Sequence, residues 1–118
     1  MTEQSLLAYL YKHLEVLGLP CDLEIVLGGF SNSYLGRYNT QTQTITLYHL
    51  EEDGSLIDLD YLLSILRHEA IHHFQWKHDK TFHRVKGIMH NQEFHRLEKI
   101  YTYKYLMMKG GVKHAKIH

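Results

Sequence analysis

The spacing of apolar residues predicts an amphipathic helix near the start of the chain. Five leucines recur at three- and four-residue steps: Leu6, Leu7, Leu10, Leu14 and Leu17. This spacing places them on one face of a helix over residues 4–17. Gly18 and then Leu-Pro follow, which is typical of a helix end.

Alternation of apolar and polar residues predicts three short strands after this helix. CDLEIVL (21–27) alternates as a strand does, and a run of Gly, Ser and Asn then marks a turn. YLGRY (34–38) is expected to be a second short strand. QTQTITLYHL (41–50) has the strongest pattern, because its residues suit a pleated surface. One face would carry Ile45 and Leu47, and the other Thr44, Thr46 and Tyr48. We expect the three strands to form one small sheet.

Two further helices are predicted in the second half. Asp58 or Asp60 can cap the first of them, whose buried stripe is formed by leucines up to Leu66. The last helix is expected over 92–108 and should bury Phe94, Leu97, Tyr101 and Met108. Between them, the pattern from residue 77 to residue 89 does not decide between a helix and a loop. We also assign Trp76 to the core.

These elements and the length of 118 residues indicate a single α+β domain. We place it at residues 1–108, followed by a basic and flexible tail at 109–118. The one cysteine, Cys21, excludes an internal disulfide framework and a multi-cysteine zinc ribbon. The first residues resemble neither a signal peptide nor a membrane span, so we expect a cytoplasmic protein with no membrane partner.

Charge is distributed unevenly along the chain. Residues 1–60 hold nine acids and two Lys/Arg, a net −7, whereas residues 61–118 hold four acids and eleven Lys/Arg, a net +7. A basic half could favour an anionic partner such as DNA. A solvated basic helix face with a ragged tail is the simpler interpretation. The oligomeric state does not follow from the sequence.

The segment HEAIH (68–72) carries the strongest chemical signal. On a helix, His68 and His72 lie on one face and can share an ion. HExxH is the zinc-peptidase signature, because two imidazoles bind Zn²⁺ while the glutamate, here Glu69, takes a proton from water. Composition alone would produce roughly 0.06 such matches in this chain. Glu69 could instead form a surface ion pair with Arg67 or Lys77.

A catalytic zinc site needs a third protein ligand. His78 has the metzincin spacing, but Gln75 stands where that pattern has a glycine. Glu93 has a spacing like that of glutamate-ligand zincins, and His83 and His95 are also within reach. We choose His90, because it opens HNQEF just before the last helix, from where a side chain can turn back towards the preceding helix. The other histidines, including His73, His114 and His118, are expected to take no part.

HEAIH followed by HNQEF resembles the SprT-like metallopeptidases, the family that includes Spartan. In that family HExxH precedes HGxxF, whose histidine is the third zinc ligand, and His90 and Phe94 fall into register with it. Asn91 stands in place of the family's usual glycine. The segment YLGRYNTQTQTITLYHL is similar to the glycine-arginine-tyrosine turn and edge strand that precede the active-site helix. With a single cysteine, these 118 residues are not expected to contain the C-terminal zinc ribbon that many members carry.

The resemblance implies a zincin-like minimal metallopeptidase domain that hydrolyses protein substrates. Zn²⁺ would be held by His68, His72 and His90, with Glu69 as general base. The strand containing Thr44, Thr46 and Tyr48, if it is a free sheet edge, could pair with an extended substrate. The alternatives are a regulatory peptidase with one dedicated target, or a metal-stabilised module without activity, for example a DNA-associated one.

Overall fold

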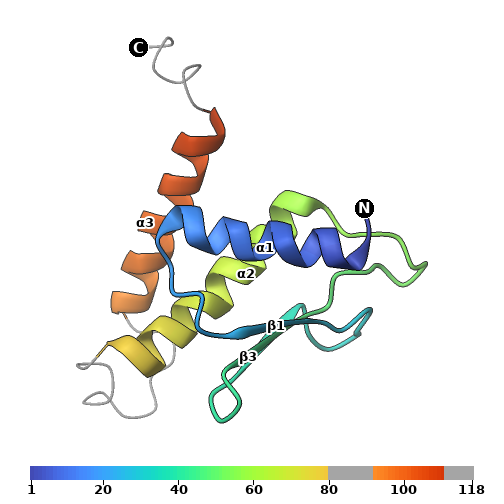
Figure 1. The fold of residues 1–118 in the computed structure, drawn as a ribbon, viewed down its shortest axis with the longest axis horizontal. Coiled ribbons are helices and arrows are strands. Elements are labelled where there is room, and N and C mark those ends of the chain that lie inside the picture. Colours follow the sequence, from blue (N-terminus) through green and yellow to red (C-terminus); the bar gives the residue numbers. More distant parts are fainter. Residues whose placement is uncertain (80–91, 111–118) are drawn as a thin grey trace.

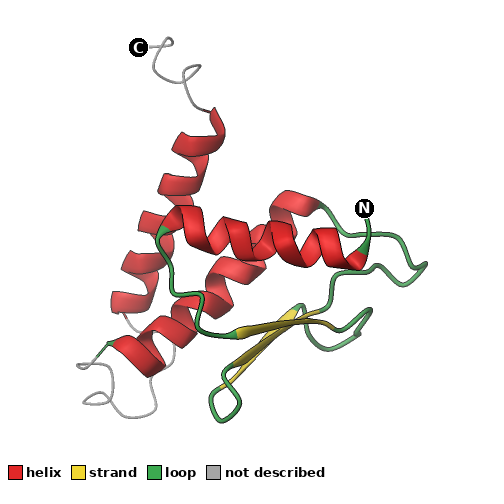
Figure 2. Ribbon diagram, viewed as in Figure 1, coloured by secondary structure: helices red, strands yellow, loops and turns green. Residues whose placement is uncertain are grey.

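Helices cover one face of a small sheet in the computed structural model, which describes residues 1–79 and 92–110 (Figure 1, Figure 2). The α+β expectation is therefore confirmed at the level of elements. Along the chain these are α1 (Glu3–Leu17), β1 (Glu24–Leu27), β2 (Gly36–Asn39), β3 (Thr44–Leu47), α2 (Leu59–His73), the π-helical turn η1 (Phe74–His78) and α3 (Gln92–Gly110).

The helix boundaries follow local capping chemistry. The Thr2 side chain accepts a hydrogen bond from the backbone of Ser5 and starts α1, and Asp58 does the same for Tyr61 at the start of α2. Gly18 ends α1 in the left-handed conformation, with a φ of 78°, which a residue without a Cβ adopts easily. α3 continues through Gly110, so the first two residues of the expected tail are helical; residues 111–118 lie outside the described part.

The sheet order is β1-β3-β2, with β3 parallel to β1 and antiparallel to β2. The expectation that Thr44 to Tyr48 offers a free edge is therefore wrong. β3 is the central strand, and its backbone hydrogen-bonding groups are shared between two neighbours. The strands at the edges of the sheet are β1 and β2.

The core lies between the helices and the inner face of the sheet. α2 packs against β2 and β3, α1 packs against β1 and α2, and α3 packs against α2. Ile45 and Leu47 are fully buried on the inner face, whereas Thr44 and Thr46 face the opposite, uncovered side. The leucine stripe of α1 is confirmed for four of its five members, Leu6, Leu10, Leu14 and Leu17, since Leu7 is only partly buried.

Two aromatic or sulfur-containing residues expected in the core are exposed instead. Trp76 is 39% exposed and Met108 is 50% exposed, while Phe94 is fully buried as predicted. Trp76 lies on η1, beyond the part of α2 that the sheet covers. Met108 lies near the end of α3, which Figure 1 shows projecting past α1.

A polar cluster beneath the surface connects all three α-helices. Arg67 of α2 is 5% exposed, and its Nη1 donates a 3.2 Å hydrogen bond to Nε2 of His13 on α1. Its guanidinium lies 4.8 Å from the ring centre of Tyr105 on α3. The Tyr105 hydroxyl in turn donates to Asp60 at 2.6 Å.

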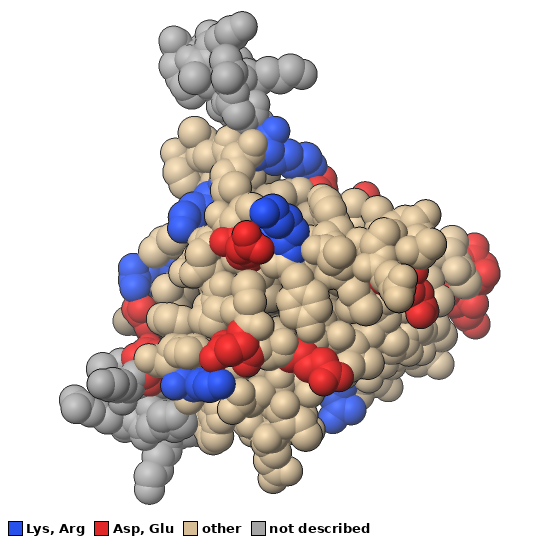
Figure 3. All heavy atoms as spheres, in the orientation of Figure 1, with Lys and Arg blue, Asp and Glu red and all other residues tan. Residues whose placement is uncertain are grey.

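The surface drawn in Figure 3 is mostly uncharged, with acidic and basic residues interspersed. The outer part of α3 is apolar: Tyr103 is 65% exposed and Leu106 is 52% exposed. None of the helices in the described ranges combines the length and the apolar character that crossing a bilayer requires.

Candidate functional site

HEAIH lies on the last turns of α2, where His68 and His72 occupy successive turns of one face. Their ring centres are 5.0 Å apart. Phe94, at the start of α3, packs against both rings, with centres 4.8 Å from His68 and 4.5 Å from His72. Because Phe94 is fully buried, it fixes how α3 approaches the two histidines.

A carboxylate from α3 orients one of these imidazoles. Oε2 of Glu98 lies 2.7 Å from Nδ1 of His68, and both side chains are about one-third exposed. When Glu98 is ionised, Nδ1 of His68 carries the ring's N–H and donates a hydrogen bond to the carboxylate. The other ring nitrogen, Nε2, is then the one with a lone pair available as a metal ligand.

Glu69 is half-buried between the helix and the sheet. Burial raises the pKa of its carboxyl, and the charge of nearby His68 only partly offsets this. The surface pairs considered for Glu69 have other partners, since Arg67 bonds to His13 and Lys77 bonds to Asp22 and Gln43. A carboxyl whose pKa is raised towards neutrality is suited to exchange protons near neutral pH.

His68 and Glu69 line a pocket of about 450 Å³ together with the segment that leads into β2. The backbone comes close to α2 there: a Cβ added at Gly36 would lie 2.6 Å from Cγ2 of Ile65 and 3.4 Å from Cγ of Glu69. Only glycine allows β2 to lie this near α2. The walls of the pocket are Ser33, Tyr34, Leu35, Gly36, Ser64, Ile65, His68, Glu69 and Glu98.

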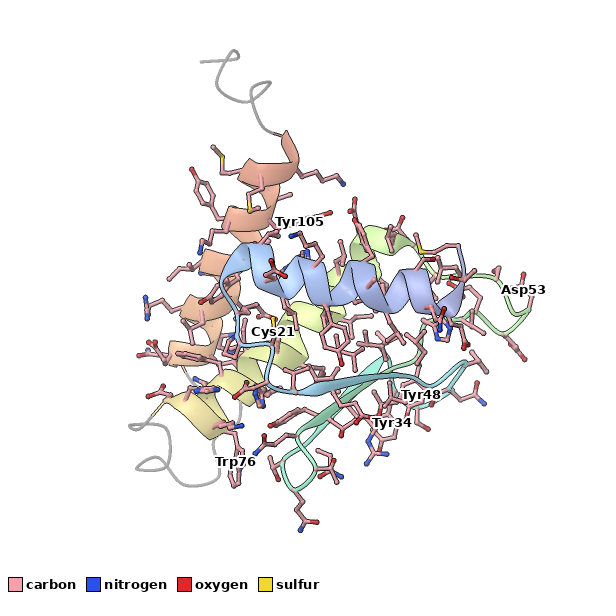
Figure 4. The ribbon with its side chains drawn as sticks, in the orientation of Figure 1. Cys21, Tyr34, Tyr48, Asp53, Trp76 and Tyr105 are labelled. Carbon is pink, nitrogen blue, oxygen red and sulfur yellow. The ribbon has the colours of Figure 1, made fainter. Side chains whose placement is uncertain are left out.

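The residues predicted to bind substrate line a different pocket. Thr44, Thr46 and Tyr48 border a polar hollow of about 400 Å³ on the uncovered side of the sheet. Only the ring of Tyr48 comes near the other pocket, because it stacks on Tyr34, a wall residue of the Glu69 pocket, with ring centres 6.4 Å apart (Figure 4). The structure therefore does not bring these three side chains into the pocket of Glu69.

His90, chosen as the third ligand, and the alternative His83 both lie outside the described residues. Within residues 1–79 and 92–110, His78, Glu93 and His95 do not form a group of three candidate ligands with His68 and His72. His78 is instead bonded to Asp22 at 2.9 Å, and Glu93 forms an ion pair with Arg96.

A second cluster of candidate metal ligands lies at the end of α2. Ligand atoms of Asp22, His73 and His78 all lie within 4.8 Å of one another. His73 is fully buried, and its Nε2 lies 2.8 Å from Oδ1 of Asp22. Its Nδ1 lies 2.6 Å from the hydroxyl of Tyr38. These residues could hold a metal ion.

Sequence reasoning did not single out Asp22, Tyr38 or Glu98. Asp22 is 51 residues from His73 along the chain, and no local sequence pattern predicts that contact. Glu98 carries a usable signal: it follows Phe94 by four residues, so on a helix the two share a face. Since Phe94 was expected to point inward, Glu98 could have been placed near the histidines.

Comparisons of the chain with protein-family models, curated proteins and solved structures found no match, so a function has to be inferred from the residues themselves.

Proposed function

We propose that the protein is a zinc-dependent endopeptidase of the zincin-like, SprT-like type, acting on protein substrates. The observation that carries this proposal is the pocket shared by His68, Glu69 and the segment entering β2. It places a carboxyl with a raised pKa, a candidate zinc ligand and a strand at the sheet edge around one hollow. That combination is what metal-assisted peptide hydrolysis requires.

The residues on α2 suit zinc. Two imidazoles on successive turns are typical zinc ligands, and the contact between Glu98 and Nδ1 of His68 is the kind of carboxylate support that such ligands usually have. His68 and His72 would hold the ion, with His90 as the proposed third ligand. Zinc, when bound, would polarise the substrate carbonyl and lower the pKa of its water ligand to about 7.

Glu69 would supply the proton transfers. Its partly buried carboxylate would take a proton from the attacking water and later give that proton to the leaving amine. Both roles need a carboxyl close to the metal-bound water, and Glu69 lines the same pocket as His68. Gly36 brings the backbone of β2 close to Glu69 and restricts the space on that side of the carboxyl.

An extended substrate would bind along β2 and the residues before it. β2 is an edge strand beside α2, so its outer backbone groups can pair with a peptide. Main-chain pairing places little demand on substrate sequence. We therefore expect cleavage of disordered or unfolded segments. The strand proposed to pair with the substrate is β2, and not β3 as expected from the sequence.

Substitution of Glu69 by Gln tests the proposal. Glu69→Gln removes the base but keeps the shape of the side chain, so zinc should still bind at the wild-type stoichiometry. Cleavage of a denatured protein should fall by about 10²-fold or more, the usual contribution of a general base. Zinc by elemental analysis and peptide release by mass spectrometry are the two measurements. Glu52→Gln, an exposed glutamate on the loop before α2, is the matched control and should cleave normally.

Two outcomes would contradict the proposal. Undiminished cleavage by Glu69→Gln would show that Glu69 is not the base. Zinc binding by the wild type without cleavage of any unfolded substrate would favour the inactive, metal-stabilised module instead. DNA binding that weakens steeply with salt would then identify the basic half of the chain as its docking surface.

A further inference from the structure

We propose that Asp22, His73 and His78 form a second transition-metal site, separate from HEAIH. This site would join the segment before β1 to the end of α2. The inference stands on its own geometry and does not depend on whether the protein is a peptidase.

The π-helical turn η1 brings the two histidines together. In an α-helix, residues five apart point in different directions, but a π-helix bonds each residue to the fifth one along and so brings these onto one face. The backbone shows this bond, from N of Asp79 to O of Phe74 at 3.0 Å. The rings of His73 and His78 are 5.7 Å apart as a result. Such turns are frequent at functional sites.

The donor set and its spacing suit zinc. Two imidazole Nε2 atoms and one carboxylate make a His₂-carboxylate set, with a fourth position open to solvent. Asp22 lies 2.8 Å from Nε2 of His73 and 2.9 Å from Nε2 of His78. Ligand atoms around a tetrahedral zinc are about 3.3 Å apart, so the two contacts of Asp22 would lengthen by about half an ångström, and the three ligand atoms already lie within 4.8 Å of one another. Asp22 and His78 are exposed and can move by this amount.

Tyr38 holds the buried ligand in either state. Without metal, Nε2–H of His73 donates to Asp22, and Nδ1 accepts from the Tyr38 hydroxyl at 2.6 Å. With metal on Nε2, the proton sits on Nδ1 and is donated to the Tyr38 oxygen, which is how ligating imidazoles are usually supported. A hydroxyl can both accept and donate a hydrogen bond, so Tyr38 can support His73 with and without the metal.

In the metal-free cluster, the ammonium group of Lys77 is the positive charge that contacts the Asp22 carboxylate. Its Nζ lies 3.0 Å from Oδ2 of Asp22 and 3.0 Å from Oε1 of Gln43. The same carboxylate also contacts His73 and His78, so these three polar partners of Asp22 all belong to this cluster. The Lys77 side chain is 36% exposed. It can keep its hydrogen bond to Gln43 when a metal ion replaces its contact with Asp22.

Counting zinc in single variants tests the site. Purified chains would be loaded with zinc, dialysed against a weak chelator and analysed for metal. Asp22→Asn and His78→Ala should each hold about one zinc fewer per chain than the wild type, whether or not HEAIH also binds. Asp53→Asn removes an exposed carboxylate on a remote loop (Figure 4) and should change nothing. Unchanged zinc in both Asp22→Asn and His78→Ala, or equal loss in Asp53→Asn, would overturn the proposal.

Lys77→Ala separates a metal site from a plain ion-pair cluster. Removing the competing ammonium should strengthen zinc binding by about tenfold, measured by competition with a chromophoric chelator. In a cluster that exists only for its hydrogen bonds, the same change would leave zinc affinity unaltered, which would also overturn the proposal. His68→Ala in parallel reports on HEAIH alone, so failure of one site is distinguishable from failure of the other.

Discussion

Glu98 and His68 form the most informative single contact in the candidate zinc site. The carboxylate meets Nδ1 at 2.7 Å and so selects the tautomer in which Nε2 has a lone pair. Glu98 comes from α3, whereas His68 belongs to α2. The contact therefore links the proposed ligand His68 to the helix that begins within HNQEF, the segment where we place the third ligand.

Glu98→Gln should weaken zinc binding without breaking the fold. An amide can still accept a hydrogen bond from Nδ1 but lacks the charge that raises the basicity of the imidazole. Losing such a partner typically lowers metal affinity 10- to 100-fold. Chelator competition measures the affinity, and nitrogen chemical shifts of His68 report its tautomer. Glu52→Gln, an exposed glutamate on the loop before α2, is the control; equal affinities for Glu98→Gln and wild type would exclude the positioning role.

β2 owes its position beside α2 to one residue without a side chain. A Cβ on Gly36 would meet Cγ2 of Ile65 at 2.6 Å, a distance that requires something to shift. Gly36→Ala should destabilise the fold by about 1–3 kcal/mol and move the strand away from Glu69. Urea unfolding gives the stability, and cleavage assays give the effect on the pocket.

A double-mutant cycle checks this cause. Ile65→Ala deletes the methyl group that the new Cβ would meet, although it also costs core burial. The double variant should therefore be more stable than the sum of the single effects implies. Strict additivity would mean that the clash with Ile65 is not what glycine avoids.

The helices could be predicted well from the sequence and the sheet only in part. Leucine spacing and Asp58 located α1 and α2 to within a residue or two, because both signals are local. The strands were predicted too long, since β3 pairs only over Thr44–Leu47. Strand order depends on which chain segments meet, and the sequence does not encode that locally, so β3 was wrongly placed at an edge.

The candidate site shows the same division. HEAIH is a local motif, and His68 and His72 do share a face of α2. Trp76 and His78 lie on η1, a change of helix type that no sequence pattern indicated, so the exposure of Trp76 and the approach of His78 to His73 were missed. Asp22 joins His73 only through the tertiary fold. The contacts that sequence reasoning missed are therefore long-range ones, or ones that follow a change of helix type.

At the scale of the whole molecule, one buried polar cluster ties α1, α2 and α3 together. Arg67 donates to Nε2 of His13, which requires that nitrogen to be unprotonated. Burial, aided by the positive charge of Arg67, lowers the pKa of His13 from 6.5 to about 4. Protonation would place two donors face to face in the interior, so the folded state favours neutral His13.

This pKa predicts an acid-sensitive fold. In the unfolded chain His13 takes up a proton near pH 6.5, while in the folded protein it does so only near pH 4. The stabilisation is therefore complete above about pH 6.5 and is lost as the pH falls towards 4, by up to about 3 kcal/mol. Urea unfolding at a series of pH values should show a shallower loss for His13→Gln. An NMR titration midpoint of His13 near 6.5 would contradict the prediction.

The exposed edge of β2 has a consequence beyond the binding of other chains. A strand that accepts a foreign peptide can equally accept the same strand of another copy, which is how sheets begin to aggregate. Here the edge is only four residues long, Gly36–Asn39, and Arg37 is exposed on it. Shortness and positive charge both discourage self-association, so replacing Arg37 with an apolar residue should make the protein oligomerise as its concentration rises.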